Sequence, residues 1–113
     1  MRTWIVLACC FAISPFALAA SRGEKERGAA IFKESGCGHC HAIANAGGHK
    51  GPDLSGVGRR RSKAAMREQI VTGSKVMPAF GEILGPEEID DLVAYLRSCR
   101  QKPAKADRAS AAE

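Results

Sequence analysis

The five residues "CGHCH" at positions 37–41 constrain this chain of 113 residues more than any other feature. Cys37 and Cys40 are separated by two residues, and His41 follows directly. Two thiols and an imidazole at this spacing can hold a zinc ion, exchange thiols and disulfides, or attach a haem covalently. The compartment and the rest of the sequence decide among these three chemistries.

The N-terminal segment indicates export. Arg2 precedes an apolar run from Trp4 to Ile13, and Ala17-Leu18-Ala19 provides a small-x-small cleavage site. This pattern is typical of a secretory signal peptide, and the run is short for a membrane span. We predict a signal peptide over 1–19 and a periplasmic protein without a membrane span after cleavage, with a retained anchor as the alternative.

Cleavage after Ala19 would leave one small domain, predicted over 20–100. It contains three cysteines, and this odd number argues against a disulfide framework. Its few aromatic residues leave little apolar surface for a core, so a chain of this size needs an additional stabilising element. Those cysteines are Cys37, Cys40 and Cys99, and the aromatic residues are Phe32, Phe80 and Tyr95.

Weighing the three chemistries favours haem. A structural zinc site usually needs a second close pair of ligands, whereas only His49 and the distant Cys99 remain. A thioredoxin-like redox pair needs a βαβ context, and no run after the signal peptide alternates like a strand. Covalent haem attachment needs only C-x-x-C-H. We therefore predict haem c attached through Cys37 and Cys40, with His41 as the proximal iron ligand and the cofactor completing the core.

Four residues are candidates for the sixth iron ligand: His39, His49, Met66 and Met77. His39 lies within the attachment segment and cannot reach around the porphyrin. His49 lies in a glycine-rich stretch, where a solvated histidine is more common than a ligand. Met66 is spaced i, i+4 from Ile70 on one face of a predicted helix, which favours packing.

Met77 is the favoured candidate. Pro78 follows it and pushes its backbone out of helical geometry. A thioether held in an extended segment suits haem iron as a ligand. The sequence therefore predicts iron ligation by His41 and Met77, and it leaves His49 or an open site as alternatives.

Periodicity and capping residues predict helices and loops only. We expect a helix over 23–35, a glycine-rich loop over 43–61 and a helix over 63–72 that begins after Ser62 and ends at Gly73. A last helix begins at Gly85-Pro86, and its apolar stripe consists of Ile89, Leu92, Val93 and Leu96. Residues 101–113 lack apolar periodicity and are predicted to be a disordered tail.

Two segments carry a resemblance to a known family. "CGHCHAIANAGGHKGPDLSGVGRR" and "VMPAFGEILGPEEIDDLVAYLRS" resemble the haem-binding segment and the methionine loop of class I c-type cytochromes, and the likeness extends over most of 24–98. It implies an all-α cytochrome c fold, with three to four helices wrapped around one covalently bound haem.

The resemblance also implies roles for single residues. Pro52 would present its carbonyl to the ring N–H of His41, Arg59 would contact a haem propionate, and Gly28 would let the first helix cross the last near Tyr95. The chain departs from the mitochondrial type in its short segment between Arg59 and Met77. Its mature part also lacks the tryptophan that the mitochondrial type has near a propionate, so the resemblance does not define its propionate environment.

A haem with two protein ligands has no open coordination site, so we predict an electron carrier that is not an enzyme. The alternatives are a peroxidase or gas sensor in which Met77 dissociates easily, and an accessory electron-transfer subunit of a dehydrogenase or oxidase.

Charge is uneven along the chain. Residues 20–75 contain 11 Lys and Arg against 5 Asp and Glu, whereas residues 76–113 contain 5 against 7. An exported protein without base-stacking aromatics is unsuited to nucleic acid. We predict redox protein partners with an acidic docking patch, which would meet basic residues in loops around the haem. Those residues are Lys50, Arg59, Arg60, Arg61, Lys63 and Lys75, with Arg59 partly engaged by the propionate.

Cys99 follows the apolar stripe of the last helix. We interpret it as a small buried apolar side chain in a monomer. The alternative is a reactive thiol or a dimer linked through a Cys99 disulfide.

Overall fold

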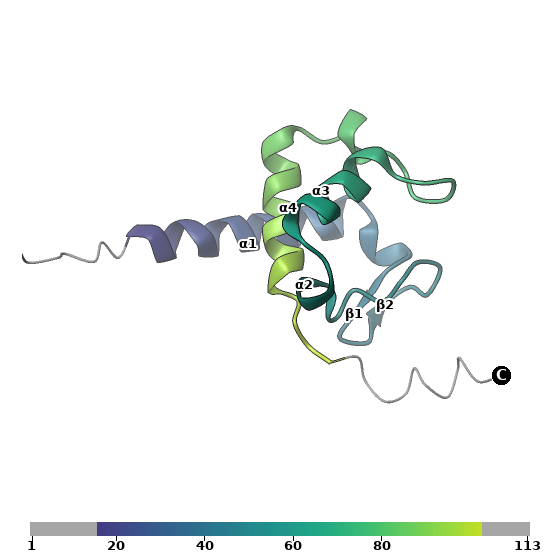
Figure 1. The fold of residues 1–113 in the computed structure, drawn as a ribbon, viewed down its shortest axis with the longest axis horizontal. Coiled ribbons are helices and arrows are strands. Elements are labelled where there is room, and N and C mark those ends of the chain that lie inside the picture. Colours follow the sequence, from purple (N-terminus) through teal and green to yellow (C-terminus); the bar gives the residue numbers. More distant parts are fainter. Residues whose placement is uncertain (1–15, 103–113) are drawn as a thin grey trace, which may run out of the picture.

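The structure, a computed structural model, describes residues 16–102, with side chains from residue 21 onward. This part of the chain is mostly helical, as predicted, and contains one small sheet (Figure 1). Its elements are α1 (Phe16–Glu34), η1 (Cys37–His39), β1 (Ala42–Ile43), β2 (Ala46–Gly47), α2 (Val57–Arg60), α3 (Lys63–Thr72), η2 (Phe80–Glu82) and α4 (Pro86–Ser98), where η1 and η2 are single 3-10 turns.

Helices α1 and α4 cross at Gly28, which is buried. A Cβ atom at this position would overlap the backbone carbonyl of Asp91 and lie 2.7 Å from the Cβ of Tyr95. Only glycine allows so close an approach, and the predicted crossing near Tyr95 is confirmed. Arg27 Nε donates to Asp91 Oδ2 over 2.8 Å and joins the same two helices on the surface.

Helix α4 supplies much of the core. Its predicted apolar stripe is buried, with no member more than 6% exposed. Pro86 occupies the first turn, where its missing N–H costs nothing, and the Gly85 N–H donates to Glu88 Oε2 over 2.8 Å. Helices α2 and α3 and the turn η2 add Val57, Met66, Ile70 and Phe80, and Cys99, which caps the C-terminus of α4, completes the cluster.

Helix α3 has the predicted bounds. The Ser62 hydroxyl accepts from the Ala65 N–H over 3.1 Å at its start, and Gly73 ends it with a positive φ of 63°. Met66 is 3% exposed, so the prediction that it packs in the core is confirmed.

The loop predicted over 43–61 is only partly a loop. Strands β1 and β2 pair antiparallel through Ala42 with Gly47 and Ile43 with Ala46, and α2 follows later in the segment. Ala44 and Asn45 form the two-residue turn with φ of 51° and 67°. The expectation of no strand was wrong because two residues per strand leave no readable alternation, and Ala-Asn lacks the usual glycine signal of such turns.

Helix α1 begins at Phe16, seven residues before the predicted start at 23. The run of alanine and leucine around Ala19 favours helix, and it continues the helix through the predicted cleavage site. Most of the predicted signal peptide and nearly all of the predicted tail lie outside the described residues, so the boundaries at 19 and 100 stay predictions. Between residues 16 and 102, no helix is long and apolar enough to cross a membrane.

Candidate functional site

The chain places both thiols of the motif and its imidazole on one tight turn. Gly36 adopts a left-handed backbone with φ of 75° and directs the chain out of α1 into η1. The N–H groups of Cys40 and His41 both donate to the Cys37 carbonyl, over 3.3 and 3.0 Å. Cys37 and Cys40 are free and half-buried, and burial raises the pKa of the Cys37 thiol.

The His41 ring is oriented by the loop that follows the hairpin. Its Nδ1 lies 2.7 Å from the Pro52 carbonyl oxygen. A carbonyl can only accept, so Nδ1 carries the proton and Nε2 keeps a free lone pair, which is the form that binds a metal. Gly51 passes directly over the ring, since a Cβ there would lie 2.6 Å from His41 Cε1.

Ser55, which none of the sequence patterns above singled out, anchors this loop. Its side chain is 1% exposed, and its hydroxyl accepts from the Ala44 N–H over 2.9 Å. Its own N–H donates to Asp53 Oδ1 over 2.8 Å. Hydrogen bonds from Ser55, helped by the positive charge of Arg60, hold the pKa of Asp53 below its usual value. The Asp-Leu-Ser spacing, a typical Asx turn, was the signal that could have identified it.

The Met77 segment is closed by a turn that begins at Ser74. The Ser74 hydroxyl accepts from the Met77 N–H over 3.2 Å, and the Ser74 N–H donates to the Met77 carbonyl over 2.8 Å. Met77 is half-buried against the core. Gln69 of α3 reaches the segment, with its Nε2 at 3.2 Å from the Gly73 carbonyl and 3.9 Å from Met77 Sδ.

The other residues considered from the sequence lie elsewhere. His39 and His49 are exposed, and Met66 is buried in the core. Arg59 is exposed on α2, and no hydrogen bond or ion pair within residues 21–102 uses its side chain. Of the candidate ligands, the structure therefore leaves His41 and Met77 half-buried and held in place by neighbouring groups.

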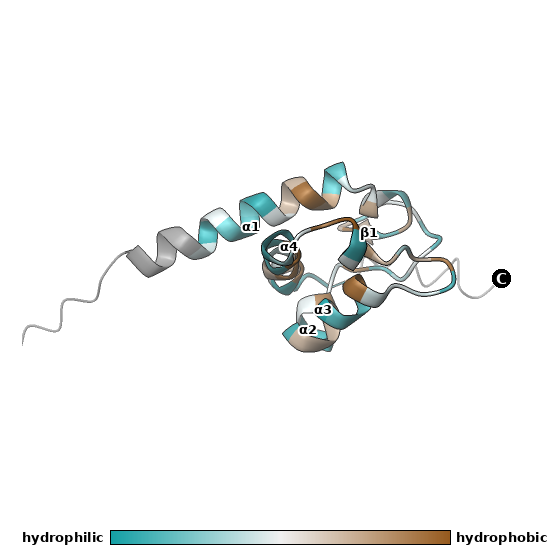
Figure 2. Cartoon of the chain, turned by 90° about the horizontal axis from the view of Figure 1, so that it is seen from above, coloured by the Kyte–Doolittle hydropathy of each residue, from teal (hydrophilic) through white to brown (hydrophobic). Residues whose placement is uncertain are grey.

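The residues present fit a haem. Many apolar side chains pack against the core and still keep exposed surface, which a flat apolar cofactor can cover. Figure 2 shows hydrophobic residues in the last turns of α1 and in α3. The one oriented imidazole, two free thiols and a held thioether are the donor set of a covalent haem site. The half-covered residues are Ile31, Phe32, Ile43, Leu54, Val71, Met77, Leu84 and Tyr95.

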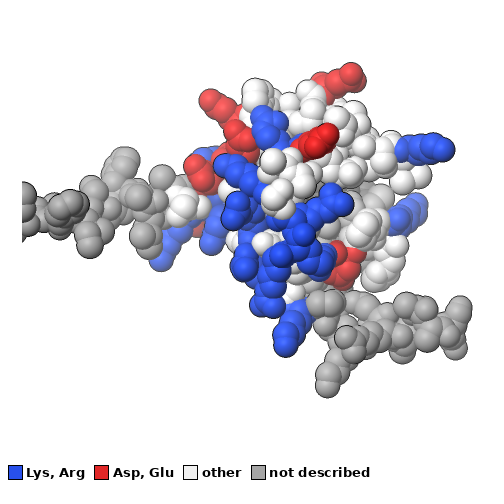
Figure 3. Space-filling view, viewed as in Figure 1, with Lys and Arg blue, Asp and Glu red and all other residues white. Residues whose placement is uncertain are grey.

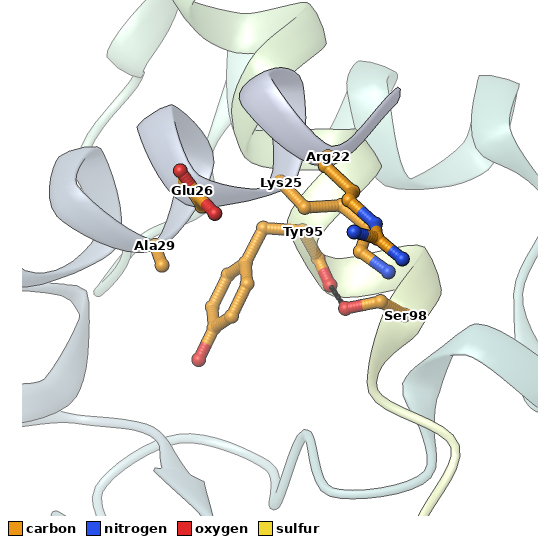
Figure 4. Close-up of a pocket in the computed structure, with 6 residues that line it drawn as sticks. All are labelled: Arg22, Lys25, Glu26, Ala29, Tyr95 and Ser98. Carbon is orange, nitrogen blue, oxygen red and sulfur yellow. Dashed lines mark hydrogen bonds between the residues drawn. The ribbon is translucent and has the colours of Figure 1, made fainter. Parts of the chain in front are cut away.

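An open pocket between α1 and α4 is separate from this site. None of the predicted haem-attachment or iron-ligand residues lines it, although the half-buried Tyr95 does, and the Ser98 hydroxyl donates to the Tyr95 carbonyl at its edge over 2.5 Å (Figure 4). The pocket is lined by Arg22, Lys25, Glu26, Ala29, Tyr95 and Ser98.

Comparison with known proteins identifies a consistent set of relatives. Residues 23–96 match the family model described as cytochrome c oxidase, cbb3-type, subunit III. A cytochrome c-553-like protein of Synechocystis is 41% identical over 80 residues, covering 70% of this chain and 72% of the relative. A cytochrome c6 of Nostoc is 37% identical over 95 residues, covering 76% and 78%.

A solved structure shares the fold. The crystal structure of the c-type cytochrome SorU from Sinorhizobium meliloti superimposes with a TM-score of 0.60 at 28% identity, covering 70% of this chain and 93% of that one.

Proposed function

Because this chain belongs to the small class I c-type cytochromes and binds haem c covalently through Cys37 and Cys40, we propose that it carries single electrons between redox proteins in the periplasm, with His41 and Met77 as iron ligands. The single observation that carries the ligand assignment is the contact between His41 Nδ1 and the Pro52 carbonyl, which directs the free lone pair of the ring to Nε2.

When bound, the haem supplies a one-electron couple at its iron. The role of the chain is to hold the two iron ligands in place. His41 binds through Nε2, and the Pro52 carbonyl keeps the ring from rotating and raises its basicity. Met77 offers a soft thioether, which favours the ferrous state and a higher potential. The turn at Ser74 and the amide of Gln69 restrict the motion of that thioether.

A site closed by two protein ligands favours electron transfer over catalysis on small molecules. The restrained Met77 segment supports this reading, and the relatives named cytochrome c6 and cytochrome c-553-like are consistent with it. We propose on this basis that the protein is not an enzyme. The Arg59 guanidinium is exposed and makes no hydrogen bond with a described residue, so it is available to contact a haem propionate.

A second candidate is an accessory electron-transfer subunit. The matching family model is described as a subunit of a cytochrome c oxidase, which favours this alternative over a sensor or peroxidase. The local chemistry is the same in both cases. Co-purification of the tagged protein with a membrane oxidase would distinguish a subunit from a free carrier.

The experiment that tests the proposal combines a redox titration with carbon monoxide binding to the ferrous holoprotein. We expect a one-electron titration and little binding of carbon monoxide in the wild type. Met77→Ala should lower the potential and bind carbon monoxide rapidly, whereas the core variant Met66→Leu should behave as the wild type. Rapid binding by the wild type would support a sensor or peroxidase instead.

A further inference from the structure

Six cationic side chains lie at the end of the molecule where α2 packs against the C-terminal end of α4. All six are exposed, and Figure 3 shows Lys and Arg side chains gathered over this region. We call this set the α2 basic surface. Its members are Arg59, Arg60, Arg61, Lys63, Arg97 and Arg100.

Backbone contacts bring the two halves of this surface together from distant parts of the sequence. The Gly58 N–H donates to the Cys99 carbonyl over 2.9 Å. A Cβ atom at Gly58 would overlap the Arg97 carbonyl, so α2 approaches α4 as closely as glycine permits. The arginines of α2 and those at the end of α4 therefore share one fixed framework.

Two of the arginines are held without losing their charge. Arg60 Nη2 donates to the Asp53 carbonyl over 2.8 Å, and Arg100 Nη1 donates to the Gly58 carbonyl over 2.9 Å. A backbone carbonyl orients a guanidinium but carries no net charge. The side chains of the remaining four make no hydrogen bond or ion pair with any described residue, and of these Arg59 is the one proposed to contact a haem propionate, which leaves Arg61, Lys63 and Arg97 uncompensated. The surface therefore stays strongly positive and is partly preorganised.

The α2 basic surface differs in its members from the basic patch that the sequence predicts. Arg97 of α4 and Arg100, which follows the helix, belong to the α2 basic surface. Lys75 lies in the segment after α3, which runs towards the N-terminal end of α4, and Lys50 lies in the segment between β2 and α2. Four of the six residues expected from the sequence therefore share one region with Arg97 and Arg100, whereas Lys50 and Lys75 lie in other segments.

We infer that the α2 basic surface is the docking surface for a carboxylate-rich patch on a protein partner. This inference rests on the proposed electron-carrier function and names its contact surface. Guanidinium groups bind carboxylates through two parallel hydrogen bonds, and a fixed cluster steers an acidic partner before contact. Membrane binding usually adds apolar insertion. The large apolar side chains that the described chain exposes, Val76 and Ile83, lie in other segments.

The test uses an octaglutamate peptide as the acidic probe. The reduced, 15N-labelled holoprotein is titrated with the peptide at low salt, and backbone amide shifts are followed. We expect shifts concentrated in residues 57–63 and 97–102. Arg61→Glu and Arg97→Glu should each weaken binding by about tenfold, and about 0.3 M salt should abolish it. Neither side chain makes a hydrogen bond in the structure, so the fold should be retained.

Lys50→Glu and Lys75→Glu are the controls, because they change net charge equally outside the surface. Equal weakening by all four variants, or shifts centred on residues 73–79, would overturn the inference. So would binding to vesicles of 30% phosphatidylglycerol in phosphatidylcholine without binding to the peptide, which would indicate a membrane surface. A redox titration of each variant distinguishes a failure of the docking surface from a failure of the proposed function. Loss of one-electron cycling would refute the proposed function and not the docking surface.

Discussion

The His41 imidazole has a defined tautomer because of the carbonyl that it meets. The contact to Pro52 comes with a close approach of the loop to the ring at Gly51, where a Cβ atom would collide with His41 Cε1. The requirement is steric and local, so it can be tested without altering any atom that touches the iron.

Gly51→Ala tests this requirement. The new methyl group would lie 2.6 Å from His41 Cε1, so either the ring or the loop must move. We expect a destabilisation of about 1–3 kcal/mol and a shifted reduction potential. Gly38→Ala is the matched control, because its methyl group would lie at an ordinary 3.7 Å from Phe32. Unchanged thermal unfolding and potential in Gly51→Ala would show that the ring is not confined by the loop.

Cys99 is 3% exposed at the end of α4, and its thiol donates to the Tyr95 carbonyl over 3.5 Å. Burial raises the pKa of this thiol, so the reactive thiolate forms only at a higher pH than in a free cysteine. In a holoprotein lacking residues 1–19, we expect slow labelling by a thiol reagent at pH 7.5, faster labelling as pH rises, and immediate labelling after unfolding. Rapid labelling at pH 7.5, or a dimer that reductant dissolves, would favour the disulfide alternative.

The helices show which parts of the fold a sequence can predict. Helix α3 matched its predicted bounds because Ser62 and Gly73 act through local hydrogen bonds that depend on residue type alone. The stripe of α4 was readable because its period is that of a helix. The hairpin at Ala44 could not be predicted in this way, because its backbone is set by tertiary contacts such as the hydrogen bond from the Ala44 N–H to the Ser55 hydroxyl.

The site was predictable to a similar degree. The attachment motif is contiguous, so Cys37, Cys40 and His41 could be identified from the sequence alone. The groups that support the site could not be identified in this way, because Gln69 contacts Met77 only once α3 has folded. The charge pattern could be counted along the chain, yet the place of Arg97 beside α2 depends on tertiary packing.

The crossing of α1 and α4 depends on one glycine. Gly28→Ala would place a methyl group on the Asp91 carbonyl and separate the helices, so we expect a loss of about 1–3 kcal/mol in the free energy of unfolding. Gly23→Ala in the same helix meets no backbone atom and only Arg27 Nη1 at 3.1 Å, in a guanidinium that also pairs with Asp91. Its gain in helix propensity of about 0.5–1 kcal/mol should offset the small shift of Arg27, so stability should stay near that of the wild type. Denaturant unfolding of both holoproteins provides the comparison, and equal effects would contradict the close crossing.

Helix α3 is coupled to the Met77 segment through Gln69. Gln69→Leu removes the donor to the Gly73 carbonyl and to Met77 Sδ. With about 1 kcal/mol lost, we expect carbon monoxide to bind the ferrous protein about fivefold more readily than in the wild type. Glu68→Gln, an exposed neighbour, is the control. If Gln69→Leu binds carbon monoxide no better than Glu68→Gln, the amide does not restrain the thioether.

Across the whole molecule, charge is separated along α4. Acidic residues lie in its N-terminal half and arginines at its C-terminal end, as Figure 3 also shows, and both complement the helix dipole. A molecule with such an asymmetry turns in the field of a charged partner before contact. That property suits a protein that must meet a partner in one orientation and leave quickly. The acidic residues are Glu87, Glu88, Asp90 and Asp91.

The most direct test of the central claim is the far-red absorption band that arises from a sulfur–iron bond in the oxidised holoprotein. We predict that the wild type shows this band at neutral pH, that Met66→Leu keeps it and that Met77→Ala loses it. A wild-type protein without the band, or a Met77→Ala protein that retains it, would contradict ligation by Met77 and, with it, the closed haem on which the electron-carrier function depends.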